Sequence, residues 1–143
     1  MEGLQSFIIG KRNLRNHYSI LWNYKVLQSL GKDIDPKNGY LLINIGKTYC
    51  ALKEYYKAED YCLKGLGLLV LMKENNTVSL GDSYNVLGTI SMSQVKFQKA
   101  MEYFLKAFEL SKGNHQALSH CCANLGNCCL ALGEYKKAEE YLV

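Results

Sequence analysis

A short pattern that recurs three times constrains this chain more than any other feature of its sequence. A glycine is followed twelve residues later by an alanine at Gly46 and Ala58, at Gly88 and Ala100, and at Gly126 and Ala138. Each alanine has an aromatic residue three positions before it, a lysine directly before it and a tyrosine three positions after it. The glycines lie 42 and 38 residues apart, and self-similarity at such a period is typical of a solenoid of stacked supersecondary units.

Each glycine and its alanine fit the two helices of an antiparallel pair, measured across the turn that joins them. Small side chains at both positions let the helices approach closely at their crossing, and the nearby aromatic residues fill the space beside them. Apolar residues at helical spacing predict helices over about 40–52, 55–72, 79–93, 97–110 and 115–132, and another from 135. The sequence therefore predicts an all-α solenoid of antiparallel helix pairs.

Turns divide the chain into four expected units of a single domain. The units are 1–38, 39–76, 77–114 and 115–143, separated by turn-forming residues around Pro36, at 73–77 and at 112–114. The first unit is degenerate, because Ile8 and Ile20 stand where later units have glycine and alanine. The fourth is truncated in its second helix, so we expect more chain, or a partner such as a second copy, to cover that helix.

Charge and hydropathy argue against several classes of protein. The formal net charge is +4, but the lysines are spread through the repeats and form no basic patch for nucleic acid. The longest apolar run, Leu66 to Met72, is far shorter than the roughly 20 residues that span a membrane. The first residues lack the pattern of a signal peptide. We therefore expect a cytoplasmic protein that binds neither nucleic acid nor a membrane.

Six cysteines leave two interpretations, a packing role and a metal site. Cys122 and Cys129 share a predicted helix face with Leu125, where thiols act as small core hydrophobes. The alternative is a metal site formed by two adjacent-cysteine pairs (121–122 and 128–129) with His120. One straight helix does not supply the loops that surround a zinc ion, so we favour packing and expect no metal and no cofactor. Disulfides are not expected, because cysteines adjacent in one helix pair poorly.

The repeated units resemble tetratricopeptide repeats from residue 40 to residue 142. The residues that carry the resemblance are Leu42, Ile45, Gly46, Tyr49, Ala58, Cys62 and Gly65, then Tyr84, Leu87, Gly88, Ser91, Ala100, Phe104 and Ala107, and finally Cys122, Leu125, Gly126, Cys129, Ala138 and Leu142. The periods exceed the roughly 34 residues usual in that family. Long units of this kind are similar to those of kinesin light chains, of Leu-Gly-Asn adaptors and of bacterial peptide-sensing regulators.

The resemblance implies a right-handed superhelix whose concave groove, lined by the first helix of each unit, binds an extended peptide or a partner helix. The candidate peptide-binding residues carried over in this way are Asn44, Lys47, Asp82, Asn85, Thr89, His120, Asn124 and Asn127. An asparagine amide both donates and accepts hydrogen bonds, so a row of asparagines suits a peptide backbone. Alternatively, these asparagines are simply solvated helix residues. Only Lys47 is basic, which argues against a clamp for a terminal carboxylate.

The function that these features favour is a protein-protein interaction module whose partner is another protein or a peptide. The sequence contains no catalytic motif of a nucleophilic, phosphate-binding or zinc-dependent enzyme, so we expect no catalytic residues. Two alternatives remain at this stage. The chain is a structural module that forms a homo-oligomer through its C-terminal unit, or it is a sensory fragment of a larger regulator.

Overall fold

The computed structural model describes residues 25, 28–29, 31, 35–72 and 77–142, where the backbone contains helices and no strand. A short 3-10 helix, η1 (Pro36–Asn38), comes before the α-helices. These are α2 (Gly39–Ala51), α3 (Tyr55–Val70), α4 (Thr77–Ser93), α5 (Phe97–Leu110), α6 (His115–Ala131) and α7 (Tyr135–Leu142). Their bounds confirm the helices predicted from apolar spacing. Almost all of the degenerate first unit expected over 1–38 lies outside the described residues.

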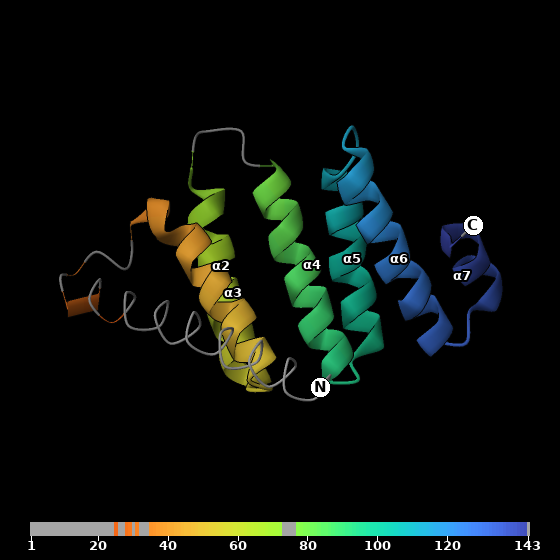
Figure 1. The fold of residues 1–143 in the computed structure, drawn as a ribbon, viewed down its shortest axis with the longest axis horizontal. Coiled ribbons are helices and arrows are strands. Elements are labelled where there is room, and N and C mark those ends of the chain that lie inside the picture. The colour runs from red at the N-terminus through yellow and green to blue at the C-terminus, as the bar shows by residue number, and fades with distance from the viewer. Residues whose placement is uncertain (1–24, 26–27, 30, 32–34, 73–76, 143) are drawn as a thin grey trace, which may run out of the picture.

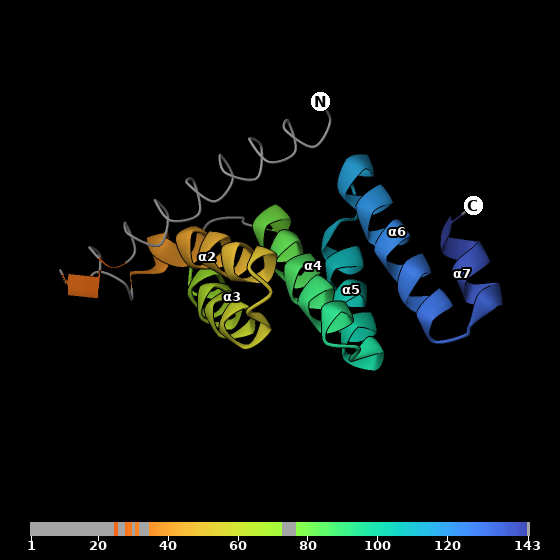
Figure 2. The same cartoon turned by 60° about the horizontal axis from the view of Figure 1, so that its bottom comes forward.

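The α-helices form two layers, with α2, α4 and α6 on one side and α3, α5 and α7 on the other (Figures 1 and 2). The most extensive packing is within the successive pairs α2/α3, α4/α5 and α6/α7. The backbone of α4 also approaches those of α2 and α6, whereas no two helices of the other layer approach each other in this way. Helices on the inner side of a curved array lie closer together, so α2, α4 and α6 form the inner layer.

This arrangement confirms the predicted all-α solenoid of antiparallel helix pairs. Within the ranges that the structure describes, no helix combines the length and the hydropathy needed to cross a bilayer.

The turns inside the three helix pairs share one hydrogen-bond pattern. The amide N–H of Glu54 donates to Tyr49 O over 2.9 Å, that of Lys96 to Ser91 O over 2.8 Å and that of Glu134 to Cys129 O over 2.8 Å. The residue before each donor is left-handed, with φ of 62° at Lys53, 61° at Val95 and 76° at Gly133. This pattern is the Schellman motif, which satisfies the last carbonyls of a helix. The three turns lie along one edge of the array, at the bottom of Figure 1, here called the lower edge.

The repeated glycines mark the places where the two helices of a pair come closest. A Cβ atom added at Gly46 would clash with Cys62 Sγ, one at Gly88 with the ring of Phe104, and one at Gly126 with the side chain of Leu142. The backbone oxygen of Ala58 would also lie 3.0 Å from a Cβ at Gly46. The close crossing expected from the glycine and alanine pattern is therefore present, and the residue sixteen positions after each glycine occupies the space that its missing side chain leaves.

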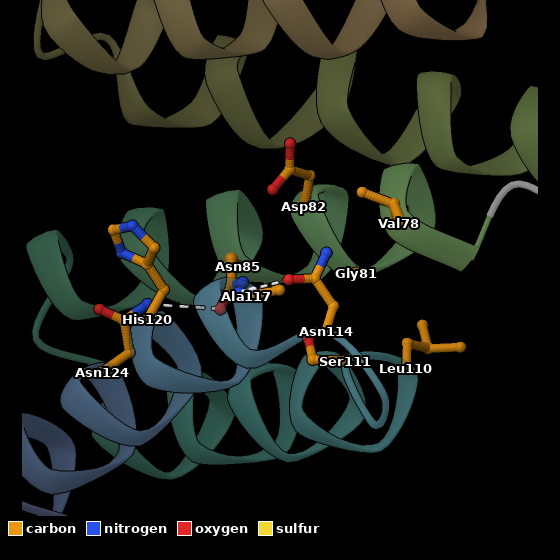
Figure 3. A pocket seen from close by; sticks show the side chains of 10 residues that line it. All are labelled: Val78, Gly81, Asp82, Asn85, Leu110, Ser111, Asn114, Ala117, His120 and Asn124. Atoms are coloured by element: carbon orange, nitrogen blue, oxygen red, sulfur yellow. Dashed lines mark hydrogen bonds between the residues drawn. The ribbon is translucent and has the colours of Figure 1, made fainter.

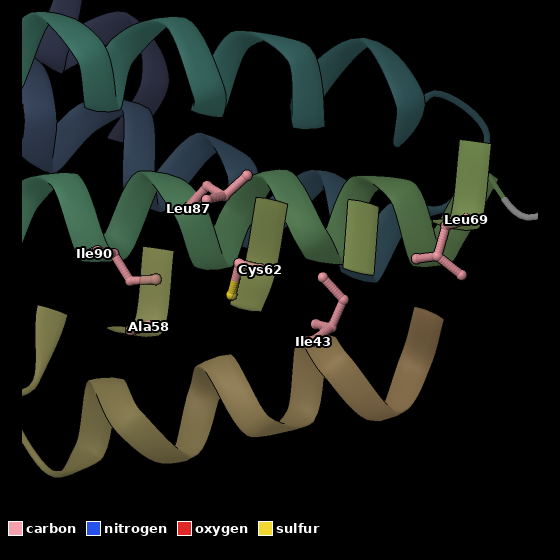
Figure 4. Packing of buried hydrophobic residues seen from close by; sticks show 6 residues of the cluster. All are labelled: Ile43, Ala58, Cys62, Leu69, Leu87 and Ile90. Atoms are coloured by element: carbon pink, nitrogen blue, oxygen red, sulfur yellow. The ribbon is translucent and has the colours of Figure 1, made fainter. Parts of the chain in front are cut away.

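The main hydrophobic core joins two successive helix pairs. It contains Ile43 from α2, Ala58, Cys62 and Leu69 from α3, and Leu87 and Ile90 from α4 (Figure 4). A second cluster, of Ala100, Phe104, Leu125 and Cys128, joins α5 to α6 in the same manner. Because each cluster draws residues from neighbouring pairs, no pair buries its apolar surface alone, which is the physical basis of solenoid stability.

The cysteines of α6 pack differently from the expectation. Cys129 is buried as predicted, but Cys122 is only partly buried, whereas Cys121 and Cys128 are fully buried. The buried face predicted for α6 is too narrow to include Cys121 and Cys128, because α6 packs against α5 as well as α7. Cys128 Sγ accordingly donates to Phe97 O at the start of α5, over 3.1 Å. All six thiols are free.

Candidate binding groove

The residues predicted to bind peptide come together along the inner layer of helices. Seven of the eight line three cavities, two between α2 and α4 and one between α4 and α6. Those seven are Asn44 and Lys47 on α2, Asp82, Asn85 and Thr89 on α4, and His120 and Asn124 on α6. The eighth, Asn127, is exposed on α6 and lines none of the three. We call the surface formed by these eight residues the groove face.

The cavity between α4 and α6 has a volume of about 200 Å³, and several polar side chains are among the residues that line it (Figure 3). Asp82 and Asn85 reach it from α4, His120 and Asn124 from α6, and Asn114 from the turn before α6. The Asn114 side chain accepts a hydrogen bond from Ala117 N over 3.1 Å, so this asparagine caps α6 as well as lining the cavity.

A chain of hydrogen bonds crosses the floor of this cavity. Asn124 Nδ2 donates to Asn85 Oδ1 over 3.3 Å, and Asn85 Nδ2 donates to Cys121 Sγ over 3.5 Å. Cys121 Sγ lies 3.3 Å from Ser111 Oγ, which itself donates to Ala107 O over 2.7 Å. The chain joins α4, α5 and α6, and its members are buried or partly buried. Asn85 and Asn124 are therefore tied to each other, and they differ in this from freely solvated surface residues.

The two asparagine amides still have hydrogen-bonding capacity to offer a ligand. An amide carries two N–H donors and an oxygen with two lone pairs. The bond from Asn124 to Asn85 and the contacts of Asn85 with Cys121 leave one N–H donor on each amide and the oxygen of Asn124. The other two predicted asparagines, Asn44 and Asn127, are exposed and make no side-chain hydrogen bond with the described residues. The groove face thus combines two positioned amides with two that are free to turn.

The larger of the two cavities between α2 and α4 has a volume of about 410 Å³ and carries one charge of each sign. Lys47 and Asp82 both line it, and both also line the smaller neighbouring cavity of about 100 Å³. Neither side chain forms an ion pair with a residue in the described part of the chain. Figure 3 shows Asp82 pointing away from α6, toward the neighbouring helix pair. Both charges are exposed and available to a ligand.

The chemistry of the groove face suits recognition. Burial raises the pKa of the Cys50 thiol, which lines the larger α2–α4 cavity, so this thiol is protonated and weakly nucleophilic at neutral pH. The Thr89 hydroxyl donates to Asn85 O over 3.0 Å, one turn back in its own helix. In the part of the chain that the structure describes, no three His, Cys, Asp or Glu residues gather in a way that could hold a metal ion.

Sequence reasoning missed two polar residues that line the α4–α6 cavity, Ser111 and Asn114. It also missed Cys121, which contacts Asn85 and Ser111 in the hydrogen-bond chain. Their places in the sequence gave one usable signal. Asn114 directly precedes a predicted helix, where asparagine is a favoured cap. Nothing comparable marks Ser111 and Cys121, because their contact depends on how α5 and α6 pack.

The family model for the tetratricopeptide repeat matches residues 81–114 and 119–143. The chain is 25% identical over 126 residues to response regulator aspartate phosphatase I of Bacillus subtilis (strain 168), and the match covers 84% of this chain and 32% of that protein. It is 32% identical over 131 residues to the 43 kDa receptor-associated protein of the synapse of Gallus gallus, covering 85% of this chain and 30% of that protein. The chain therefore spans about a third of the length of these relatives.

Solved structures give the same result for the fold. BtubC (BKLC) from P. vanneervenii superposes with a TM-score of 0.82 at 20% identity, covering 92% of this chain and 54% of that one. The TPR-like repeats of a putative kinesin light chain from Podosopora anserina superpose with a TM-score of 0.74 at 13% identity, covering 96% of this chain and 67% of that one. The resemblance to long-period repeats is confirmed, and residues 81–114 and 119–143 of this chain are tetratricopeptide repeats within a solenoid of the same type.

Proposed function

We propose that this chain is a protein-interaction module that holds an extended peptide or a partner helix against the groove face. The observation that carries the proposal is the convergence of residues from three helices: α2, α4 and α6 each contribute at least two of the seven predicted residues that line adjoining cavities. Amides for a peptide backbone lie beside one positive and one negative side chain, a combination that suits a polar ligand of mixed charge.

The names of the relatives are consistent with a protein partner. One is a phosphatase of a response regulator, and the other is associated with a receptor. The chain matches about a third of each, so the activity of either whole protein is not transferred to it. We propose a binding role without catalysis, since burial keeps the Cys50 thiol beside the larger α2–α4 cavity protonated.

We propose a cytoplasmic location and a partner that is neither nucleic acid nor membrane. The pairing of four lysines supports a partner other than nucleic acid. Lys57, Lys64, Lys112 and Lys137 each pair with an acidic residue three or four positions away, at 2.8 to 3.1 Å. A nucleic-acid surface needs cations that are free to contact phosphates, and the charge of each of these four lysines is neutralised locally.

The test compares two triple variants. The groove variant carries Lys47→Ala, Asp82→Ala and Asn127→Ala, which remove exposed side chains that make no ion pair with the described residues. The matched control carries Lys136→Ala, Glu102→Ala and Gln98→Ala, which remove a base, an acid and an amide from the exposed surface of α5 and α7. Peptides selected from a random display library on the wild-type chain are then titrated against each variant by fluorescence anisotropy.

We expect the groove variant to bind the selected peptides at least about tenfold more weakly, because it loses two charges and one amide. The control variant should bind like the wild type. Equal binding by the groove variant would overturn the proposal. Light scattering on the same samples tests the alternative in which the partner is a second copy. That alternative predicts a dimer in the wild type and in both variants.

A further inference from the structure

A larger cavity lies at the lower edge, away from the groove face. Its volume is about 520 Å³, and its lining comes from the α2–α3 and α4–α5 turns and the helix ends beside them. The lining residues are Lys53, Glu54, Tyr55, Tyr56, Lys57, Gln94 and Lys96. None of the predicted groove residues is among them. We call this the lower-edge cavity; the turns that form it are at the bottom of Figure 1.

The charges of the lower-edge cavity do not balance. Lys57 Nζ pairs with Glu54 Oε2 at 2.8 Å, so the only acid in the lining is already neutralised. Lys53 and Lys96 are exposed and form no ion pair within the described residues. Lys96 Nζ lies 5.9 Å from the centre of the Tyr56 ring, which places one of these cations beside an aromatic wall. Two positive charges are thus left for an external anion.

Two further features of the cavity call for a ligand with more than a negative charge. Tyr56 is 81% exposed, and a large ring of this kind offers contact area at little conformational cost. Gln94 Oε1 is buried and accepts no hydrogen bond from the described residues. A buried acceptor without a donor is unfavourable, so a ligand N–H would be favoured if the Gln94 side chain turned its amide toward the cavity.

The geometry of the cavity is fixed by the two turns. Lys53 and Val95 are both left-handed, and the Schellman hydrogen bonds that follow hold Glu54 and Lys96 in equivalent positions on neighbouring pairs. The lysines therefore project from a backbone that is already ordered, which lowers the entropy lost when a ligand binds.

We propose that the lower-edge cavity is a second peptide-binding site, independent of the groove face, that takes an acidic segment of a protein partner. A side-chain carboxylate is held between Lys53 and Lys96, and a neighbouring apolar side chain packs on Tyr56. The Gln94 side chain turns outward, and its Oε1 accepts a hydrogen bond from a backbone N–H of the peptide. An acidic peptide satisfies all three features at once. A free inorganic anion would use the lysines but would leave the glutamine and the tyrosine ring without a partner.

In the experiment, peptides are selected from a random display library by their binding to three immobilised proteins. These are the wild-type chain, the double variant Lys53→Ala/Lys96→Ala, and the control Lys136→Ala. The control removes an exposed lysine in the first turn of α7 that forms no ion pair with the described residues. Peptides recovered on the wild type are titrated against all three proteins, and against the groove variant described above, by fluorescence anisotropy at low and high salt.

We expect a class of peptides rich in Asp and Glu that binds the double variant at least about fivefold more weakly than the wild type. The same class should bind Lys136→Ala and the groove variant as tightly as the wild type, and its affinity should fall with added salt because the charges are exposed. The proposal is overturned if the wild type selects no acidic class, if the double variant binds that class with unchanged affinity, or if the groove variant alone loses it. Inorganic phosphate that competes as well as the acidic peptide would also overturn it.

Discussion

Asn124 on α6 donates a hydrogen bond to Asn85 on α4 across 3.3 Å, and this contact links two helix pairs through their inner layer. Both residues lie three positions or fewer from a repeat glycine, Gly88 or Gly126. Asn85 extends the link to Cys121 Sγ. The asparagines of the groove face therefore have a structural task in addition to the binding role proposed for them.

The Asn85 and Asn124 side chains should be energetically coupled. We expect the single variants Asn85→Ala and Asn124→Ala each to lower the free energy of unfolding by about 1 kcal/mol, since each leaves a partly buried partner without its hydrogen bond. A double-mutant cycle measured by urea denaturation should give a coupling of about 0.5–1.5 kcal/mol. Asn127→Ala, at an exposed position on the same helix, should change stability by less than about 0.5 kcal/mol. Strict additivity in the cycle would contradict the hydrogen bond.

Valine at position 95 should make the folded chain less stable than glycine would. A β-branched residue at φ 61° is disfavoured, since a left-handed conformation costs an L-residue about 1–2 kcal/mol. Val95 is 70% exposed, so replacing it removes little packing. We expect Val95→Gly to raise stability by about 0.5–1 kcal/mol after the added entropy of glycine in the unfolded chain, and to raise Tm by a few degrees.

The equivalent turn of the last helix pair provides the control for that prediction. Gly133 has φ 76° at the corresponding position, so Gly133→Val should lower Tm. If both substitutions shifted Tm in the same direction, backbone conformation would not be the cause.

The fold could be predicted from the sequence to a large extent, because its determinants are local and repeated. Apolar spacing predicted both the first and the last residue of α5 correctly, and the glycine and alanine pattern predicted the close helix crossings. The left-handed turns at Lys53 and Val95 were not foreseen, since neither residue is the glycine that usually marks such a turn. The hydrogen bonds of the turn and the packing of the pair impose this conformation from outside the local sequence.

The groove face could be predicted only as a set of positions. Its residues lie at a fixed register from each glycine, so a periodic sequence places them on one layer. The hydrogen bonds of these residues depend on distant parts of the chain. Asn85 and Asn124 are 39 residues apart, and no local sequence pattern shows that their side chains are hydrogen-bonded. The unexpected burial of Cys121 and Cys128 has a similar origin, because the buried face of α6 widens through its contact with α5.

Gly88 should not tolerate a side chain. A methyl group at this position would meet the ring of Phe104, which is 2% exposed and has no room to move. We expect Gly88→Ala to lower the free energy of unfolding by about 1–3 kcal/mol in chemical denaturation. Phe104→Leu should cost less in the Gly88→Ala background than in the wild type, because the smaller side chain makes space for the methyl group.

Gly126 is a matched test of the same argument. A methyl group there would meet Leu142, which is 48% exposed at the end of α7 and is free to shift. Gly126→Ala should therefore cost clearly less than Gly88→Ala. A larger loss at Gly126 than at Gly88 would show that the close crossing is not the cause.

Cys62 should make stability depend on pH in the alkaline range. Its side chain is 0% exposed, and burial raises the pKa of this thiol from 9.0 to about 12. In the unfolded chain the thiol ionises near pH 9, so between pH 9 and 12 the folded state holds a proton that the unfolded state has lost. The contribution of Cys62 to stability is thus fully present below pH 9 and decreases as the pH rises toward 12, by up to about 1.4 kcal/mol per pH unit.

Urea denaturation of the wild type and of Cys62→Ala at several alkaline pH values measures this effect. Cys62→Ala should be less stable at neutral pH, because it leaves a cavity beside Gly46, but its stability should fall less steeply above pH 9. Ile90→Val, a buried change in the same core that carries no titrating group, should lower stability while keeping the wild-type slope. Burial also raises the pKa of the Cys128 and Cys129 thiols, but both are present in all three proteins, so the difference in slope belongs to Cys62. Identical slopes for the wild type and Cys62→Ala would mean that the folded chain leaves this thiol free to ionise.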